Sequence, residues 1–524
     1  MPLRRRNILR LGTVALSLLV LVVSSGCRRA ASPQPVAKHV ILFVGDGMSL
    51  ASEIAASRYL YGQDRGLAWH PFAVRAYVAT WDVTAYNKNA KDEKHPPYRE
   101  ETFSPSIGYD TRIEGRAPHP LDTLYLTRPA PLKGRPSVDS AAAATAMATG
   151  RKTASGRVSW LPDKGPEGRL RTIVEDYREA MGGAVGVVST VPFNHATPAP
   201  FVSHNISRTH YYTGYKEKTG TGIADEIIRE TRPDVVIGGG HPLLDNPGLD
   251  PDKGYVSAAL LDELRADREY VFVEREPGVD GGIALLAAAE RAGAEGRKLF
   301  GLFGGPEGNF ETPVAGDSPG SPSVARATLE NPALLDATLA ALRVLGRNPN
   351  GFFVMIEQGD IDWAHHDSDF GRMIGAMSDL EEAVRAAVAY VDLPGDGIDW
   401  TNTLLIVTAD HATGGFRLNP DKPLGIGDLP RQSPLTEDEI KARKQGAGGR
   451  GFVCPVVYPD GEVSYSTSGH ANELVTLSAT GAGARLFVGY KGLWYPGPII
   501  DNTHINAVIR RFLGLGPLSR GPLP

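Results

Sequence analysis

The feature that most constrains this chain is the alternation of short apolar runs with helix-like segments along most of its length. The runs of strand length are His39–Val44, Ala184–Val188, Asp234–Ile237, Leu299–Phe303, Phe352–Ile356, Thr403–Val407 and Arg485–Val488. The helix-like segments are Ser140–Ala148, Ile223–Glu230, Ala258–Ala266, Ala333–Val344, Phe370–Tyr390 and His504–Phe512. Strands without polar/apolar alternation are typical of a parallel sheet that is covered on both faces. We therefore predict an α/β fold with a central, mostly parallel sheet flanked by helices on both faces.

Three stretches interrupt this alternation and are rich in charged residues, proline or glycine. They cover about residues 84–136, 306–332 and 417–467. Connections of this length are uncommon unless they serve a site or an interface, so we expect long surface insertions. The folded domain is predicted to span residues 39–515, followed by a C-terminal tail over residues 516–524.

Residues 1–26 have the order of an export signal, in which basic residues precede an apolar run and small residues. Its arginine pair resembles a twin-arginine signal, and Gly26-Cys27 resembles the end of a bacterial lipoprotein box. We therefore expect export to the bacterial periplasm or cell surface, a lipid anchor at Cys27 and a tether over residues 27–38. The alternative is an uncleaved membrane anchor. Lipidation of Cys27 would leave Cys454 alone, so no internal disulfide is expected.

The net charge of the 524-residue chain is −5, and the predicted signal contains four arginines and no acidic residue. The remainder is therefore four units more negative. Nucleic-acid binding usually needs a basic face, so nucleic acid is not expected as a general partner.

Potential metal ligands follow three of the predicted strands directly. Asp46 follows the first strand, Glu357 follows Phe352–Ile356, and Asp410 and His411 follow Thr403–Val407. In a parallel sheet these carboxyl ends share one edge, which is where such sheets bind ligands. One acidic residue after a strand is usually a cap, but four potential ligands at one edge favour a metal site.

A second pair of candidate ligands has helical spacing. Asp362 and His366 are four residues apart, so on a helix they lie on one face. His365 is a competing ligand, although it lies about 100° away around the helix. A solvated charged face is the alternative. Sets of carboxylate and imidazole suit zinc, and a catalytic zinc keeps one position open.

Ser140 opens a predicted helix immediately after Asp139. One interpretation is an N-cap, in which either side chain accepts from free backbone amides. The other makes Ser140 a nucleophile beside helix-terminal amides that attract an anion. No Gly-x-Ser-x-Gly elbow surrounds it, so a neighbouring metal would have to ionise the hydroxyl.

Six ordered motifs resemble those of the alkaline phosphatases over about residues 38–515. They are Val44-Gly45-Asp46-Gly47-Met48, Asp139-Ser140-Ala141 with Thr145-Ala146 and Thr149-Gly150, His195-Ala196-Thr197-Pro198, Glu357 to His366, Thr408-Ala409-Asp410-His411, and Ser468-Gly469-His470. The resemblance implies hydrolysis of small-molecule phosphate monoesters through a phosphoserine at Ser140. The alternatives are a phosphodiesterase of the same superfamily and a non-catalytic surface protein that binds metal or phosphate.

The resemblance also implies two Zn²⁺ ions and one Mg²⁺ ion, and it assigns their ligands. One zinc would be held by Asp362, His366 and His470, and the other by Asp46, Asp410 and His411. The third metal would be held by Asp46, His195, Thr197 and Glu357. Arg208 resembles the family's phosphate-clamping arginine, since a planar guanidinium suits two phosphate oxygens. Relatives are often dimers, so a homodimer is an expectation.

Two positions depart from part of the family. His195 stands where some branches carry Asp, and an imidazole is a softer ligand than a carboxylate, so the third site is expected to accept zinc, cobalt or manganese in place of magnesium. Trp363 stands where some branches carry Lys or His in the substrate-binding region. The missing cation would weaken one contact to phosphate.

Overall fold

The computed structural model describes residues 37–109, 137–242, 254–431, 456–458, 460–516 and 518. The predicted export signal, nearly all of the tether, Cys27, Cys454 and nearly all of the C-terminal tail lie outside the described residues. Within the described residues, no helix combines the length and the apolar character that crossing a membrane requires.

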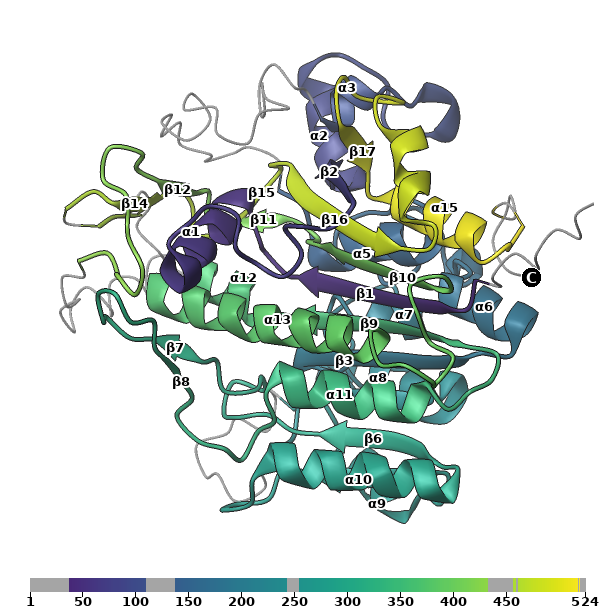
Figure 1. Cartoon of the computed structure of the whole chain (residues 1–524). Coiled ribbons are helices and arrows are strands. Elements are labelled where there is room, and N and C mark those ends of the chain that lie inside the picture. Colours follow the sequence, from purple (N-terminus) through teal and green to yellow (C-terminus); the bar gives the residue numbers. More distant parts are fainter. Residues whose placement is uncertain are drawn as a thin grey trace, which may run out of the picture. The chain divides into compact units, whose positions relative to one another are not determined.

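The centre of the fold is a ten-stranded sheet, shown in Figure 1. Its order is β17-β2-β16-β10-β1-β9-β3-β4-β6-β5. The strands are β1 (His39–Gly45), β2 (Val74–Ala79), β3 (Ala184–Pro192), β4 (Val235–Gly239), β5 (Tyr270–Glu274), β6 (Lys298–Leu302), β9 (Phe352–Gln358), β10 (Thr403–Thr408), β16 (Val475–Gly481) and β17 (Ile499–Asp501). All pairs from β10 to β5 are parallel, and only β16 pairs antiparallel with its neighbours β10 and β2. The mostly parallel sheet is therefore confirmed.

Helices cover both faces of this sheet (Figure 1). One group comprises α1 (Leu50–Tyr61), α10 (Gly281–Glu295), α11 (Leu334–Leu345), α12 (Asp360–His366) and α13 (Phe370–Val391). The other comprises α5 (Ser140–Thr149), α6 (Ile173–Met181), α7 (Ala199–Val202) and α15 (Thr503–Phe512). Strands β1, β3, β9 and β10 are buried along their whole length, which explains their near-continuous apolar sequences.

Two predicted elements differ from the structure. The run Arg485–Val488 is not a strand, because it lies in η6 (Ala484–Tyr490), a 3₁₀ helix that begins after Gly483 at φ +79°. A short apolar run does not distinguish strand from helix by itself, and Val488 is 55% exposed here. The adjacent strand is β16, whose mixed polar and apolar sequence conceals it. The predicted helix Ile223–Glu230 is a short α8 (Ile223–Asp225) that continues as a π-helical segment, η4 (Glu226–Thr231). The predicted helix Ala258–Ala266 is present with the same bounds as α9.

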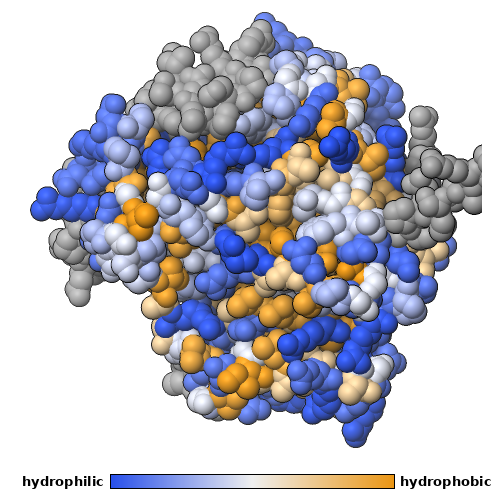
Figure 2. Space-filling view, in the orientation of Figure 1, coloured by the Kyte–Doolittle hydropathy of each residue, from blue (hydrophilic) through white to orange (hydrophobic). Residues whose placement is uncertain are grey.

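The described parts of the three long insertions have structure of their own. The first contains α2 (Val83–Asp92), η1 (Glu100–Thr102) and α3 (Pro105–Gly108), which enclose a small aromatic core around Trp81 and Tyr86. The second contains the hairpin β7 (Val314–Ala315) and β8 (Val324–Ala325). The third contains β12 (Phe416–Leu418), β13 (Val456–Val457) and β14 (Val463–Tyr465), which form a three-stranded sheet. On the face shown in Figure 2, hydrophilic and hydrophobic residues are interspersed.

Candidate active site

The predicted ligands after the central strands lie together at one edge of the sheet. Val44 of β1 is paired with Thr408 of β10 on one side and with Glu357 of β9 on the other. Asp46 and Asp410 each come two residues beyond this row. The parallel register therefore brings Asp46, Glu357 and Asp410 to the same place, as the sequence predicts.

Asp46, Asp410 and His411 form one group of possible metal ligands. Nε2 of His411 lies 3.6 Å from Oδ1 of Asp46 and 3.3 Å from Oδ2 of Asp410. All three side chains are buried. Oδ1 of Asp410 accepts from the backbone amides of Gly47 and His411 at 3.1 and 2.8 Å, which fixes its orientation.

Asp362, His366 and His470 form the second predicted group. Asp362 and His366 are on α12, and His470 is on β15 (His470–Ala471), which pairs with β11 (Ala412–Thr413) directly after His411. Nε2 of His366 lies 3.1 Å from Oδ2 of Asp362 and 3.1 Å from Nε2 of His470. The helical spacing thus places Asp362 and His366 on one face.

The orientation of these two imidazoles fits a bound cation. Nδ1 of His366 donates to the carbonyl oxygen of Ser468, and Nδ1 of His470 donates to that of Val138, both at 2.5 Å. With both Nδ1 atoms donating, the Nε2 atoms are the ones left to contact a cation, and they lie 3.1 Å apart. Nε2 of His366 also faces Asp362, which outweighs burial and raises the pKa of His366 to about 9, so positive charge is favoured at this place. Fixing the tautomer through Nδ1 is the usual arrangement in metal-binding histidines.

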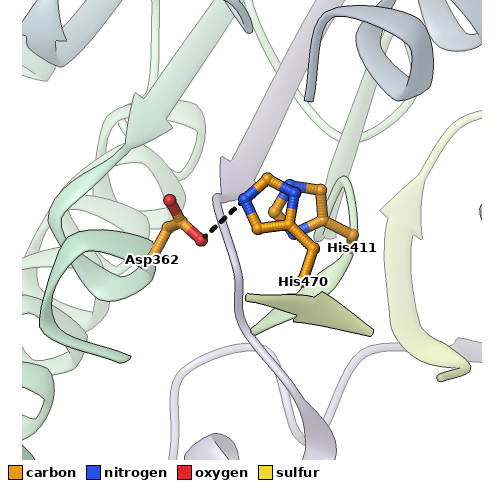
Figure 3. A group of neighbouring side chains, drawn as sticks. All are labelled: Asp362, His411 and His470. Carbon is orange, nitrogen blue, oxygen red and sulfur yellow. Dashed lines mark ion pairs between the residues drawn. The ribbon is translucent and has the colours of Figure 1, made fainter. Parts of the chain in front are cut away.

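The two groups adjoin through His411. Possible ligand atoms of Asp362, His411 and His470 all lie within 4.8 Å of one another. The rings of His411 and His470 are stacked with centroids 3.8 Å apart. Figure 3 shows the two stacked rings with Asp362 facing His470. Two cations held here would be close enough to act on one substrate.

The electrostatics of the carboxylates also fit bound cations. Burial, together with the neighbouring carboxylates, raises the pKa of Asp46 well above its usual range and that of Asp410 to about 7. Burial raises the pKa of Glu357 to about 8. Within the described residues, Asp46 Oδ1, Asp410 Oδ2 and Glu357 Oε1 are buried without a hydrogen-bond partner. Buried, closely spaced acidic groups with free oxygen atoms are stabilised in their ionised form by positive charge.

Ser140 lies at the junction of the two groups. It is the first residue of α5, and its Oγ is 3.0 Å from Nε2 of His411. Asp139 is the N-cap residue, because its side chain accepts from the amide of Ala142 at 3.2 Å. The capping function therefore falls to Asp139, and the hydroxyl of Ser140 is directed at the ligand cluster.

Arg208 is held beside Ser140. Its Nη1 donates to Oδ2 of Asp139 at 2.7 Å, and its backbone amide donates to the carbonyl oxygen of Gly156 at 2.7 Å. The amide of Gly156 in turn donates to Oδ1 of Asp139 at 2.8 Å. The guanidinium is only partly buried, so it can also bind an anion next to the serine.

The residues predicted for a third site are less closely grouped. Oγ1 of Thr197 donates to Oδ2 of Asp46 at 3.4 Å, and both Thr197 and Glu357 are fully buried. His195 contacts Trp363, with ring centroids 6.0 Å apart. Neither of the two compact groups of possible ligands found among the described residues includes His195.

His365, the competing ligand on α12, has a different environment. Its Nε2 is 2.8 Å from Oγ of Ser52, and its ring packs against Phe416 and Tyr465. The structure therefore places His365 in the packing between α12, α1 and the β12–β14 sheet, turned away from His366.

Sequence reasoning missed three residues that orient the site. The sequence indicates Asp139 only as a capping residue, although its side chain also holds Arg208. The hydroxyl of Thr413 donates to Oδ1 of Asp362, and that of Ser189 donates to Oε2 of Glu357, both at 2.5 Å. Ser189 lies on β3 directly opposite Glu357 in the register. Strand pairing could have indicated it, but pairing is not visible in the sequence.

Comparison with known proteins agrees with this geometry. Residues 124–433 match the family model described as alkaline phosphatase. The alkaline phosphatase of Escherichia fergusonii is 31% identical over 510 residues, which cover 93% of this chain and 88% of that protein. The chain belongs to the alkaline phosphatase family.

Other proteins match this chain at lower identity. The solved structure of the Thermus thermophilus alkaline phosphatase superposes with a TM-score of 0.57 at 21% identity and covers 94% of both chains. Streptomycin-6-phosphate phosphatase of Streptomyces griseus is 28% identical and covers 86% of this chain and 88% of that protein. Membership in the alkaline phosphatase family places the protein among the phosphatases, which are hydrolases.

Proposed function

We propose that this alkaline phosphatase family member hydrolyses phosphate monoesters through a phosphoserine formed at Ser140. The observation that carries the proposal is the 3.0 Å contact between Ser140 Oγ and His411 Nε2, at the place where the two groups of possible metal ligands adjoin. A hydroxyl in this position can be ionised, and its oxygen can then attack an anionic substrate.

The ligand assignment follows the two groups. Asp46, Asp410 and His411 would hold one zinc ion, and Asp362, His366 and His470 the other. When bound, these ions would supply the positive charge that ionises the serine and neutralises the charge developing on the leaving oxygen. The protein is acidic overall, so this positive charge has to be local.

The remaining steps fall to residues of the chain itself. Arg208 binds two oxygens of the phosphate, and the first amides of α5 attract the same group. Ser140 Oγ then forms a bond to phosphorus while the bond to the alcohol oxygen breaks, and the alcohol leaves. Water then attacks the phosphoserine from the side that the alcohol left, which restores Ser140 and releases inorganic phosphate. Asp139 keeps Arg208 oriented through both halves of the reaction.

A third metal is proposed for Asp46, His195, Thr197 and Glu357. The imidazole of His195 favours zinc, cobalt or manganese over magnesium. A TAB5 alkaline phosphatase variant in which a histidine is replaced by aspartate has magnesium bound in a site named M3. We expect His195→Asp to raise the magnesium content of this protein, measured by elemental analysis after dialysis against both metals.

The proposal also covers the location and assembly of the protein. We propose export with lipidation of Cys27, and a homodimer in solution. The mass of the mature protein tests the first, because a lipidated form begins at Cys27 and carries acyl chains. Sedimentation equilibrium of the purified domain tests the second. A protein that keeps residues 1–26, or a strictly monomeric one, contradicts the respective proposal.

The decisive experiment compares Ser140→Ala with Ser321→Ala, which changes an exposed serine outside the site. Each purified protein is assayed with p-nitrophenyl phosphate and with bis-p-nitrophenyl phosphate, and metal is quantified on the same samples. We expect Ser140→Ala to lose turnover by about 10³-fold or more while retaining metal, because the nucleophile is absent. Ser321→Ala should match the parent, which should prefer the monoester.

Each contrary result points to a different alternative. Substantial turnover by Ser140→Ala contradicts the phosphoserine mechanism. A parent protein that prefers the diester is a phosphodiesterase. A parent protein that binds phosphate and metal but turns over neither substrate is the non-catalytic alternative.

A further inference from the structure

A large cavity lies at the opposite end of α5 from Ser140. It measures about 930 Å³, and its lining includes Gly150 at the C-terminal end of α5, residues of α15 and residues of the first insertion. A helix of ten residues spans about 15 Å, so the cavity is separate from the site around Ser140. Its volume is within the usual range for pockets that bind a small molecule.

The walls of this cavity are largely aromatic. Tyr98, Phe103 and Trp494 are half-buried and line it, and the ring of Phe103 lies 4.8 Å from that of Trp494. Trp81, stacked on Phe103, closes the wall behind them. Aliphatic carbons of Leu161, Ala507 and Leu515 line the cavity as well. Such walls suit a flat apolar ligand, because its apolar surface would be removed from water as it packs against the aromatic rings.

The charges around the cavity are predominantly positive. The cationic residues in its lining are Arg99, Arg151, Lys152, Lys164, Arg510 and Arg511, and the acidic ones are Glu100 and Asp163. Three of these cations are already paired with acidic side chains, namely Arg151 with Glu100, Lys152 with Asp501, and Arg510 with Asp176. In the part of the chain that the structure describes, Arg99, Lys164 and Arg511 have no such partner. An excess of cations in an acidic protein indicates an anionic occupant.

We propose that this cavity is a second binding site, which takes an amphiphilic anion with a flat apolar body and one acidic group. The aromatic wall of Phe103 and Trp494 holds the body, and Arg99 and Arg511 at the rim hold the acidic group. The inference is independent of the phosphatase chemistry, because no residue of the cavity belongs to either ligand group.

The test uses two fluorescent probes with the same rings, anilinonaphthalene sulfonate and the uncharged N-phenylnaphthylamine, on the metal-loaded full-length protein. We expect one sulfonate per chain and about 10-fold weaker binding of the uncharged probe, the difference expected for one charge-assisted contact. Inorganic phosphate at concentrations that saturate the active site should not displace the sulfonate. Displacement by phosphate would show that the probe binds at Ser140, and would overturn the proposal.

Variants separate this cavity from other surfaces. Arg99→Ala combined with Arg511→Ala should weaken sulfonate binding by about 10-fold and leave the uncharged probe unaffected. Trp494→Leu should weaken both probes. Arg291→Ala, which removes an exposed arginine on α10, is the matched control and should change neither. These three variants should hydrolyse p-nitrophenyl phosphate as the parent does. Equal sulfonate affinity in the double variant and in Arg291→Ala, or several equivalent probes per chain, would refute the site.

Discussion

Arg208 donates from Nη1 to Oδ2 of Asp139 at 2.7 Å, and Asp139 is the residue that immediately precedes Ser140. Burial by itself raises the pKa of Asp139, but Arg208 and the amide of Gly156 outweigh it and lower that pKa to about 2. The carboxylate is therefore charged over the whole working range of pH. One side chain thus caps the helix that carries the serine and orients the cation beside it.

Replacing Asp139 should weaken the binding of phosphate. Asp139→Asn keeps an N-cap oxygen but loses the charge that fixes Arg208, and Asp139→Ala loses both. We expect the inhibition constant of inorganic phosphate to rise about 3- to 10-fold in Asp139→Asn, the range expected for weakening one charged hydrogen bond. Asp139→Ala should in addition unfold at a lower temperature. Unchanged phosphate inhibition in both variants would show that Arg208 is oriented by other contacts.

His204 should make stability depend on pH. Its Nδ1 lies 2.8 Å from Oε1 of Glu226 and its Nε2 lies 2.9 Å from the carbonyl oxygen of Leu170, so both nitrogens face acceptors. Burial lowers the pKa of His204, but Glu175 and Glu226 outweigh it and raise that pKa to about 9. Nη2 of Arg169 also lies 3.1 Å from Nδ1 of His204, and Arg169 pairs with Glu226.

A raised pKa in the folded state stabilises the protein fully below the unfolded value near 6.5, and the contribution is lost as pH rises through about 9. The loss is on the order of 3 kcal/mol. Urea unfolding of the parent and of His204→Gln should therefore differ strongly at pH 6 and little at pH 10. The control His95→Gln should have the same stability as the parent at both pH values. A difference between the parent and His204→Gln that does not change with pH would contradict the ionised pair.

Metal removal should lower both activity and thermal stability. Cations bound by the folded state alone stabilise it by mass action, by about 2.7 kcal/mol per site at a hundredfold excess over the dissociation constant. We expect EDTA to abolish hydrolysis and lower the melting temperature, and zinc to restore both. His470→Ala is the control. This variant lacks one of the proposed metal ligands, so EDTA should lower its melting temperature less than that of the parent. Full activity after exhaustive chelation would contradict metal dependence.

Gly47 should tolerate no side chain. Its φ is +73°, and a Cβ at this position would lie 2.7 Å from Cα of Asp362. Gly47→Ala should therefore push Asp362 away from Asp46 and reduce turnover by well over tenfold, because small displacements of reacting groups are costly. Gly278→Ala is matched, since its φ is +74° with open space around it, and it should lose only stability. Equal activity of Gly47→Ala and Gly278→Ala would show that the ligand groups accommodate a methyl group at position 47 without loss of function.

Several features of the site could be predicted because their geometry is local. Asp46 and Asp410 follow continuous apolar strands, and parallel strands end at one edge whatever their order in the sheet. Asp362 and His366 share a helix face by spacing alone. The sequence does not indicate β16, which pairs antiparallel between β10 and β2, because the buried polar residues Thr476 and Ser478 interrupt its apolar run. The sequence predicts a strand over Arg485–Val488 instead, where the structure has a 3₁₀ helix.

The sequence by itself determined the family and the fold class of this protein, because the residue types, their order and the periods of strand and helix are written along the chain. Only the tertiary structure decided which residues act together. The pairing of Arg208 with Asp139, of Thr413 with Asp362 and of Ser189 with Glu357 each joins residues at least 51 positions apart. Such contacts depend on strand register and helix packing, which arise from burial of the whole core and not from any local pattern.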